Sequence, residues 1–125
     1  DHRVEFTQGQ QAQIDTLLGQ FEQQPYTPPT MKQSIDEIGE DLVTALIETD
    51  RLIQVNEDVL FTPETYQEMR QAVIDHIQER GSITLAELRD KFDTSRKYAV
   101  AVLEHLDQTG VTIRRGDHRQ LRRQV

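Results

Sequence analysis

The chain has 125 residues, of which 35% are hydrophobic and 29% are charged, and its formal net charge is −8. This length predicts one domain or two very small ones, and because the chain begins with Asp we expect a fragment of a longer protein. No apolar run approaches the ~20 residues of a membrane span and there is no Cys to form disulfides, so we expect a cytoplasmic protein without membrane contact.

Residues 1–62 are predicted to form three helices followed by a hairpin. Thr7 and Gln10 have the spacing of a capping box, and apolar residues then recur every three or four positions, which indicates an amphipathic helix. Two short amphipathic helices follow, separated by Gly39. Apolar runs on both sides of Asn56-Glu57-Asp58 predict the hairpin.

Residues 63–125 repeat this order of elements. Pro63 follows a Thr and precedes a Glu, a pattern typical of the first turn of a helix. Thr84 lies three residues before a Glu and predicts the start of a second helix, and we expect Thr94 to cap the third. Gly116-Asp117 is the predicted turn between two strands.

The two halves align with an offset of 60 residues. Apolar residues coincide where each half needs a core, in the pairs Leu42 and Val102, Leu46 and Leu106, Ile53 and Ile113, and Phe61 and Leu121. Helices ending in a two-stranded wing are typical of the winged-helix fold. We therefore predict a mainly α fold with small β-hairpins (α+β), formed by two tandem winged-helix domains at 1–62 and 63–125.

The charge is distributed unevenly between the halves. Residues 1–63 have three Lys/Arg and twelve Asp/Glu, a net charge of −9, whereas residues 64–125 have a net charge of +1. From Thr94 onward the net charge is +4. This asymmetry predicts a nucleic-acid surface near the C-terminal end and an acidic, spacer-like first domain.

The predicted third helices begin with opposite charges. The first half has Gly39-Glu40-Asp41 where the second has Ser95-Arg96-Lys97. Cations in a first turn oppose the helix macrodipole at a cost of up to ~1 kcal/mol, but together with the free amides they form an anion site. Tyr98 borders the core and is either a packed boundary residue or a base-stacking residue, and we expect Ala101 to face solvent with Lys97.

The predicted wing is also cationic. Arg114 and Arg115 precede the turn, and side-chain alternation puts them on opposite faces of the strand, so one wing arginine can pair with an acid of its own domain. We expect Asp117 to fix the backbone of the turn, with a base contact as the alternative. The cations of this segment are Arg114, Arg115, Arg119, Arg122 and Arg123.

We expect no catalytic, metal or cofactor site. The sequence has no Gly-rich phosphate loop, and its serines lie in capping or turn contexts without a base nearby. The histidines share no ligand spacing and are interpreted as ordinary surface or boundary residues. They are His2, His76, His105 and His118.

The second half contains a motif of a known family. Thr94-Ser95-Arg96-Lys97-Tyr98-Ala99, then Leu103-Glu104-His105-Leu106-Asp107, then Thr112-Ile113-Arg114-Arg115-Gly116-Asp117, resembles the last winged-helix domain of bacterial selenocysteine-specific elongation factor. The resemblance implies binding of the selenocysteine insertion hairpin (SECIS) of mRNA, which tethers the factor for UGA recoding in translation. By position, the RNA-binding residues would be Ser95, Arg96, Lys97, Tyr98, Arg114, Arg115, Gly116, Asp117 and Arg119.

The resemblance also implies what other parts of the factor would contribute. GTP and the GTPase activity would belong to absent N-terminal domains, so no cofactor is expected in this fragment. The fragment would be a non-catalytic monomer, and its connection to the ribosome would be indirect.

Two other functions fit the residues. A tandem winged-helix transcription regulator that binds DNA uses the same scaffold and similar charges. A protein-interaction module would use the acidic first half as its working surface. Competition between duplex DNA and an RNA hairpin tests the first alternative, and binding that survives moderate salt and ignores RNA would favour the second.

Overall fold

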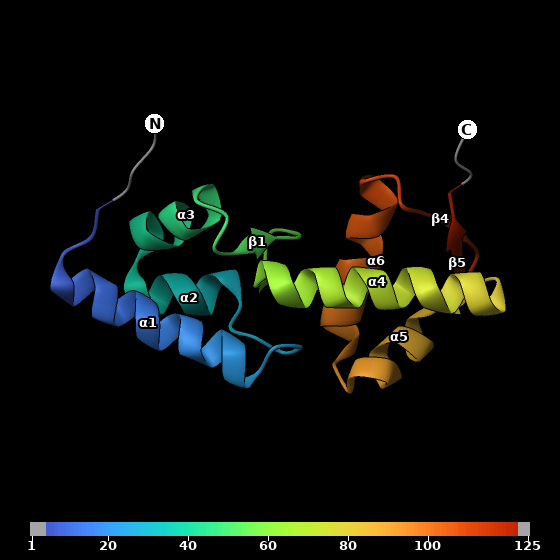
Figure 1. The fold of residues 1–125 in the computed structure, drawn as a ribbon, viewed down its shortest axis with the longest axis horizontal. Helices are drawn as coiled ribbons and strands as arrows, with labels where there is room; N and C mark the ends of the chain where they lie inside the picture. Colours follow the sequence, from blue (N-terminus) through green and yellow to red (C-terminus); the bar gives the residue numbers. More distant parts are fainter. Residues whose placement is uncertain (1–4, 123–125) are drawn as a thin grey trace. The chain divides into compact units, whose positions relative to one another are not determined.

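The structure is a computed structural model that describes residues 5–122 (Figure 1). His2, Arg3 and Arg123 lie outside the described residues. The chain divides into two compact units, Asp1–Pro63 (unit 1) and Glu64–Val125 (unit 2). None of the helices formed by the described residues has the length and apolar character needed to cross a bilayer.

Unit 1 has three helices and a two-stranded antiparallel sheet. Its elements are α1 (Gln8–Gln23), α2 (Met31–Ile38), α3 (Glu40–Glu48), β1 (Ile53–Gln54) and β2 (Leu60–Phe61). Capping boxes begin α1 and α2, where the hydroxyls of Thr7 and Thr30 accept hydrogen bonds from backbone N–H groups three residues later. Gly39 makes the one-residue connection to α3 with a φ of 92°, a conformation that other residues rarely adopt.

The core of unit 1 is formed by α1 packing against α2 and α3. Ile14, Leu17 and Phe21 of α1 are fully or almost fully buried, and they form one cluster with Val43 and Leu46 of α3. Each such side chain contributes about 1.5–3 kcal/mol when fully buried, so this cluster is the main stabilising term of the unit. Five more apolar residues pack against the cluster and stay partly exposed: Phe6, Leu18, Met31, Ile35 and Ile47.

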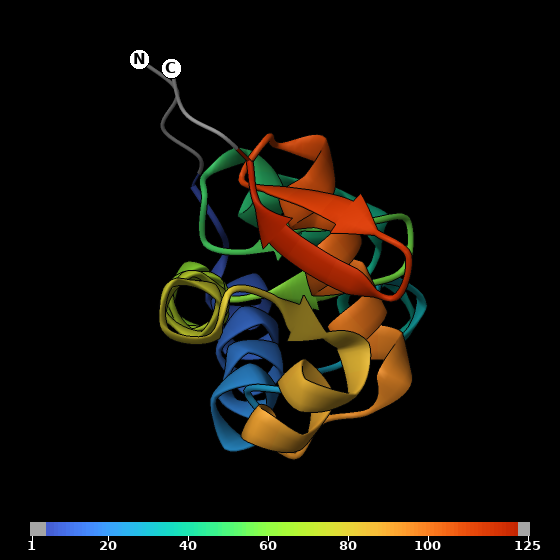
Figure 2. The same cartoon turned by 90° about the vertical axis from the view of Figure 1, so that its right-hand side faces the viewer.

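Unit 2 has three helices and a three-stranded antiparallel sheet in the order β3-β5-β4 (Figure 2). Its elements are α4 (Pro63–Arg80), β3 (Ile83–Thr84), α5 (Leu85–Phe92), α6 (Arg96–Gln108), β4 (Thr112–Arg115) and β5 (His118–Leu121). The capping box predicted at Thr84 is confirmed, with Glu87 as its partner. Three helices followed by this small sheet form the winged-helix fold, in which α5 and α6 are the helix-turn-helix and β4–β5 are the wing.

Strand β3 is an addition to the elements expected from the sequence. Ile83 pairs with Arg119 and Thr84 pairs with His118, so the wing is held along one edge by the segment that leads into α5. A two-residue strand is too short to show alternation, and its pairing partner lies more than thirty residues away along the chain.

The third helices of the two units end in the same way. The hydroxyls of Thr49 and Thr109 donate to the carbonyl oxygens four residues earlier, at 2.7 and 3.0 Å. The next residue has a positive φ in both units, 61° at Asp50 and 82° at Gly110. These matched contacts place α3 and α6 in register at an offset of 60 residues.

The beginnings of these two helices differ. α6 has 13 residues and α3 has nine, and the additional four, residues 96–99, form an extra first turn. Glu40 is therefore in register with Val100, and the expected equivalence of Gly39-Glu40-Asp41 with Ser95-Arg96-Lys97 is wrong. The cations of α6 lie on a turn that unit 1 lacks.

Two further expectations for α6 are corrected by the structure. The N-cap residue is Ser95 and not Thr94. Ala101 is 1% exposed, so the expectation that it faces solvent is wrong. Because α6 contacts both α5 and β4, it is buried over a broader arc than the single apolar stripe indicates.

Candidate nucleic-acid interface

The turn between α5 and α6 determines where the first turn of α6 lies. Asp93 adopts the left-handed conformation (φ 50°, ψ 44°), and the Thr94 N–H donates to the Arg89 carbonyl oxygen at 3.0 Å. These features end α5 and redirect the chain within three residues, as in other helix-turn-helix connections. Ser95 then occupies the N-cap position of α6.

The N-terminus of α6 differs from those of the helices that begin with a capping box. Ser95 makes no capping hydrogen bond, and the first turn contains no acid. By contrast, α1, α2 and α5 each begin with a capping box. The first-turn N–H groups of α6 therefore keep the partial positive charge of the helix end, which is the arrangement that binds phosphate at other helix N-termini.

Two exposed cations lie on this first turn. The Arg96 guanidinium forms no hydrogen bond or ion pair with any other described residue. The Lys97 Nζ lies 5.8 Å from the centroid of the Tyr98 ring. Both cations add to the positive end of the helix dipole, which costs a few tenths to ~1 kcal/mol in the free protein and would be offset by an anion bound there.

Tyr98 lies beneath this turn. The residue is only 8% exposed, so its ring is packed into unit 2 and offers little surface on which a base could stack. Of the two roles open from the sequence, the geometry fits the packed boundary residue. Tyr98 therefore supports the cationic turn instead of lying on its outer face.

The tip of the wing is a two-residue turn formed by Gly116 and Asp117. Arg115 pairs with His118 across it, and Gly116 has a φ of 65°, as in a type II′ turn that begins with glycine. The Asp117 carboxylate is exposed and lies 3.5 Å from the His118 Nε2. The conformation of Gly116 thus accounts for the turn, and the expectation that the Asp117 side chain fixes its backbone has no support among the described contacts.

The two arginines before this turn differ in their contacts. The Arg114 Nε donates to the Gly116 carbonyl oxygen at 2.8 Å, so this side chain folds over the turn. The Arg115 guanidinium is exposed and has no partner among residues 5–122. Both side chains remain on the surface of the wing, and Arg115 is the one whose donors are all available.

Arg119 was expected to face RNA, but the structure places its side chain inside unit 2. It is 6% exposed, and its guanidinium donates to the Asp107 Oδ2 at 3.0 and 3.2 Å. The other oxygen of Asp107 accepts from the Thr112 hydroxyl at 2.6 Å. A buried guanidinium needs a carboxylate partner, and β5 places Arg119 between β3 and β4, where α6 supplies one. Arg119 therefore holds the wing against α6.

The remaining predicted residues lie at two places on unit 2. In Figure 2 the wing tip lies on the same side of the unit as the first turns of α6. We call this exposed set the cationic face; it consists of Ser95, Arg96, Lys97, Arg114, Arg115, Gly116 and Asp117. Arg119 and Tyr98 lie behind it and stabilise it.

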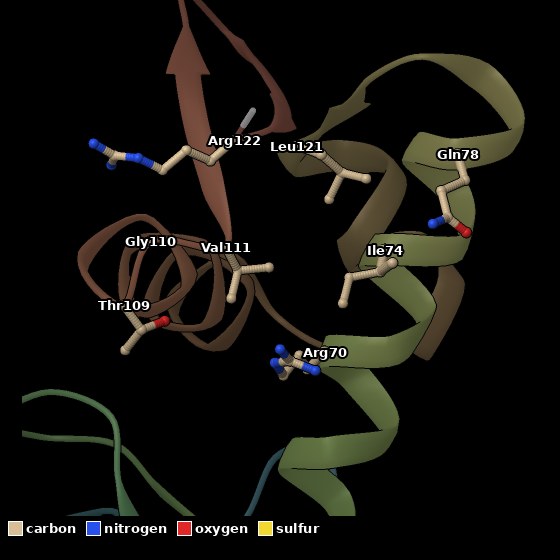
Figure 3. Close-up of a pocket in the computed structure, with 8 residues that line it drawn as sticks. All are labelled: Arg70, Ile74, Gln78, Thr109, Gly110, Val111, Leu121 and Arg122. Carbon is tan, nitrogen blue, oxygen red and sulfur yellow. The ribbon is translucent and has the colours of Figure 1, made fainter. Parts of the chain in front are cut away.

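A hollow of about 580 Å³ lies elsewhere on unit 2, near the C-terminal end of α6 (Figure 3). Ile74, Val111 and Leu121 face one another across it, and the Arg122 side chain points outward. Arg70 of α4 lies at its edge and is a partly exposed cation that the sequence argument does not include. An isolated arginine on an amphipathic helix gives no signal that distinguishes a binding residue from a solvated one.

Among the described histidines, His105 contacts α4 and His118 lies at the wing turn. The Tyr66 hydroxyl lies 2.6 Å from the His105 Nδ1 with the rings at 86°, and this pair joins α4 to α6. Burial lowers the pKa of His105 and raises the pKa of Tyr66, so both groups are neutral near pH 7. The described residues contain no cluster of three or more potential metal ligands.

The fold and the cationic face together define a winged-helix domain of the nucleic-acid-binding type. Residues 75–121 match the family described as elongation factor SelB, winged helix. The chain is also 30% identical over 102 residues to the selenocysteine-specific elongation factor of Desulfomicrobium baculatum and 27% identical over 128 residues to that of Escherichia coli K12. These matches cover 77% and 98% of the chain, but only 16% and 20% of the two relatives.

Solved structures show the same fold over almost the whole chain. The mRNA-binding domain of elongation factor SelB from E. coli, solved in complex with SECIS RNA, matches with a TM-score of 0.74 at 24% identity, over 94% of this chain and 100% of that one. A bacterial selenocysteine-specific elongation factor, EF-Sec, matches with a TM-score of 0.67 at 19% identity, over 94% of this chain and 19% of that one. The resemblance to the C-terminal winged-helix part of selenocysteine-specific elongation factors is confirmed.

Proposed function

We propose that this chain binds the SECIS hairpin of mRNA through the cationic face of unit 2, as part of a selenocysteine-specific elongation factor. The observation that carries the proposal is the extra first turn of α6. Its N-cap residue, Ser95, makes no capping hydrogen bond, the turn contains no acid, and Arg96 and Lys97 are exposed on it. Phosphates supply the negative charge that this turn otherwise lacks.

The likeness to a SelB domain solved with SECIS RNA favours RNA over duplex DNA as the partner. The physics of RNA recognition agrees with a small two-part surface. The deep major groove of an A-form stem is closed to side chains, so sequence is read in the unpaired loop bases while cations follow the backbone.

We assign different contacts to the two parts of the cationic face. Ser95, Arg96 and Lys97 hold phosphates at the N-terminus of α6. Arg115, with Gly116 and Asp117 at the wing tip, approaches the loop, where a backbone without bulky side chains allows close contact with bases. Arg114 keeps the tip folded through its hydrogen bond to the Gly116 carbonyl oxygen.

The complete factor would add functions that this chain does not contain. We propose that other domains bind GTP and hydrolyse it, and that the chain holds them near the ribosome through the mRNA, in the cytoplasm. The chain would act as a monomer, since a hairpin presents one loop. Unit 1, with its net charge of −9 over residues 1–63, would be repelled by the RNA and would serve as an acidic spacer.

The test is a filter-binding titration of the whole chain with three nucleic acids. These are the SECIS hairpin, the same stem with a scrambled loop, and a DNA duplex of equal length. We expect the hairpin to bind at least about tenfold more tightly than either competitor, with affinity that falls steeply with salt. Equal binding to the scrambled loop would reject sequence reading, and preference for the duplex would favour a DNA-binding function.

A further inference from the structure

Unit 1 has a groove of its own on the solvent side of α3. It has a volume of about 310 Å³ and lies between α2, α3 and β1. Its floor includes Met31, Ile35 and Ile47, which pack against the core of unit 1 but stay partly exposed. Glu40 and Glu48, one at each end of α3, lie along its rim.

The two rim carboxylates have their charges available. Glu40 and Glu48 are exposed, and neither side chain forms an ion pair or hydrogen bond with another residue in the described range. The unit around them is strongly acidic, because residues 1–63 have only three Lys/Arg against twelve Asp/Glu. A ligand of this groove therefore meets a negative rim around an apolar floor.

Unit 2 shows that the fold does not require an apolar side chain at two of these positions, those of Ile35 and Ile47, although Met31 corresponds to the apolar Leu85. Since α3 and α6 are in register, Ile47 corresponds to Asp107, which is paired with Arg119. Both α2 and α5 have eight residues and begin after a capping threonine, so Ile35 corresponds to Arg89. Exposed apolar groups that the fold does not need, gathered in one groove, indicate a surface that is covered by a partner.

We propose that this groove binds a basic, amphipathic segment of a protein partner. The apolar side chains of the segment would contact Met31, Ile35 and Ile47, and its Lys or Arg side chains would face Glu40 and Glu48. Charge complementarity selects this occupant over RNA, because phosphates would be repelled by the same carboxylates. The inference is independent of the function proposed for unit 2 and gives unit 1 a partner of its own.

The test uses the whole chain and a synthetic helical peptide of Leu and Lys as the probe. Binding is followed by fluorescence anisotropy and by the side-chain methyl signals of isoleucine. We expect the signals of Ile35 and Ile47 to shift, while those of the buried Ile14 and Ile83 do not. A peptide with Glu in place of Lys, and one with Ser in place of Leu, should each bind at least about tenfold more weakly.

Variants of the chain locate the site. Glu40→Lys/Glu48→Lys should weaken peptide binding at least about tenfold, whereas Glu5→Lys/Glu22→Lys, with the same change of charge outside the groove, should change it less than about twofold. Ile35→Arg, which copies unit 2, tests the apolar floor and should also weaken binding about tenfold. Equal weakening by the two charge-reversed pairs, no effect of Ile35→Arg in the folded chain, or a loss of hairpin binding in Glu40→Lys/Glu48→Lys would overturn the proposal.

Discussion

The buried ion pair between Arg119 and Asp107 gives a quantitative prediction for the stability of unit 2. In Arg119→Met the packing of a long side chain is kept, but Asp107 loses its ion pair and retains only the Thr112 hydroxyl. Breaking a buried ion pair by removing one partner costs about 3–5 kcal/mol. The Asp107 side chain is 25% exposed and that of Arg119 is 8% exposed, so water relieves part of the cost and we expect about 3 kcal/mol.

The assay is urea unfolding, with amide signals of β5 and α6 reporting on unit 2. In a thermal melt of a unit of this size, the same loss of about 3 kcal/mol corresponds to a fall in Tm of roughly 12–24 °C. Arg115→Met is the matched control and should change stability by less than about 0.5 kcal/mol, since that guanidinium has no described partner.

A double-mutant cycle with Asp107→Asn isolates the pair from the other effects of each substitution. We expect a coupling energy of at least about 1.5 kcal/mol between the two positions. Two results together would contradict a structural role for this ion pair: Arg119→Met leaves the stability unchanged, and it lowers hairpin affinity as much as Arg96→Ala does. Arg119 would then be an RNA-binding residue.

Three smaller changes test the local structure. Gly116→Val should lower the stability of the wing by about 1–3 kcal/mol, because valine disfavours a φ of 65°. Amide hydrogen exchange in β4 and β5 should become faster, and unchanged or slower exchange would contradict the type II′ turn. The Thr84 N–H donates to the Glu87 carboxylate at 2.8 Å and lowers its pKa, so unfolding titrations should show stability present above pH ~4.5 and lost as pH falls through the lower folded pKa. Glu87→Gln should flatten that dependence, and an unchanged slope would argue against the capping box. Tyr66→Phe should cost about 1 kcal/mol at pH 8, where both groups are neutral and share one hydrogen bond, and an unchanged stability would show that the 2.6 Å contact is not a stabilising hydrogen bond.

Features that depend on neighbours in the chain could be predicted from the sequence. The capping boxes at Thr7 and Thr84 follow from residue types three positions apart, and the structure confirms both. The turn at Gly116-Asp117 is likewise local and lies where it was expected. Each of these features is decided within one turn of backbone, so the residues that form it are visible together in the sequence.

Features that depend on distant pairing could not be predicted. Arg119 is buried because β3 pairs with β5 and because Asp107 of α6 lies beneath the wing. Alternation along β5 does not reveal either neighbour, so an internal arginine has the same pattern as an exposed one. The N-cap of α6 was misplaced by one residue for a related reason: Thr94 and Ser95 are both good N-cap residues, and only tertiary structure decides between them.

The measurement that tests the central claim most directly is the affinity of Arg96→Ala/Lys97→Ala for the SECIS hairpin, compared with Lys32→Ala, at two salt concentrations. If the extra turn of α6 holds phosphates, the double variant binds at least about tenfold more weakly, and the slope of log affinity against log salt becomes smaller by between one and two. Lys32 lies on acidic unit 1 and is paired with Asp36 at 3.2 Å, so its loss should leave affinity and slope unchanged. Equal effects of the two variants, or a double variant with the affinity and salt slope of the parent chain, would contradict an RNA surface localised on unit 2.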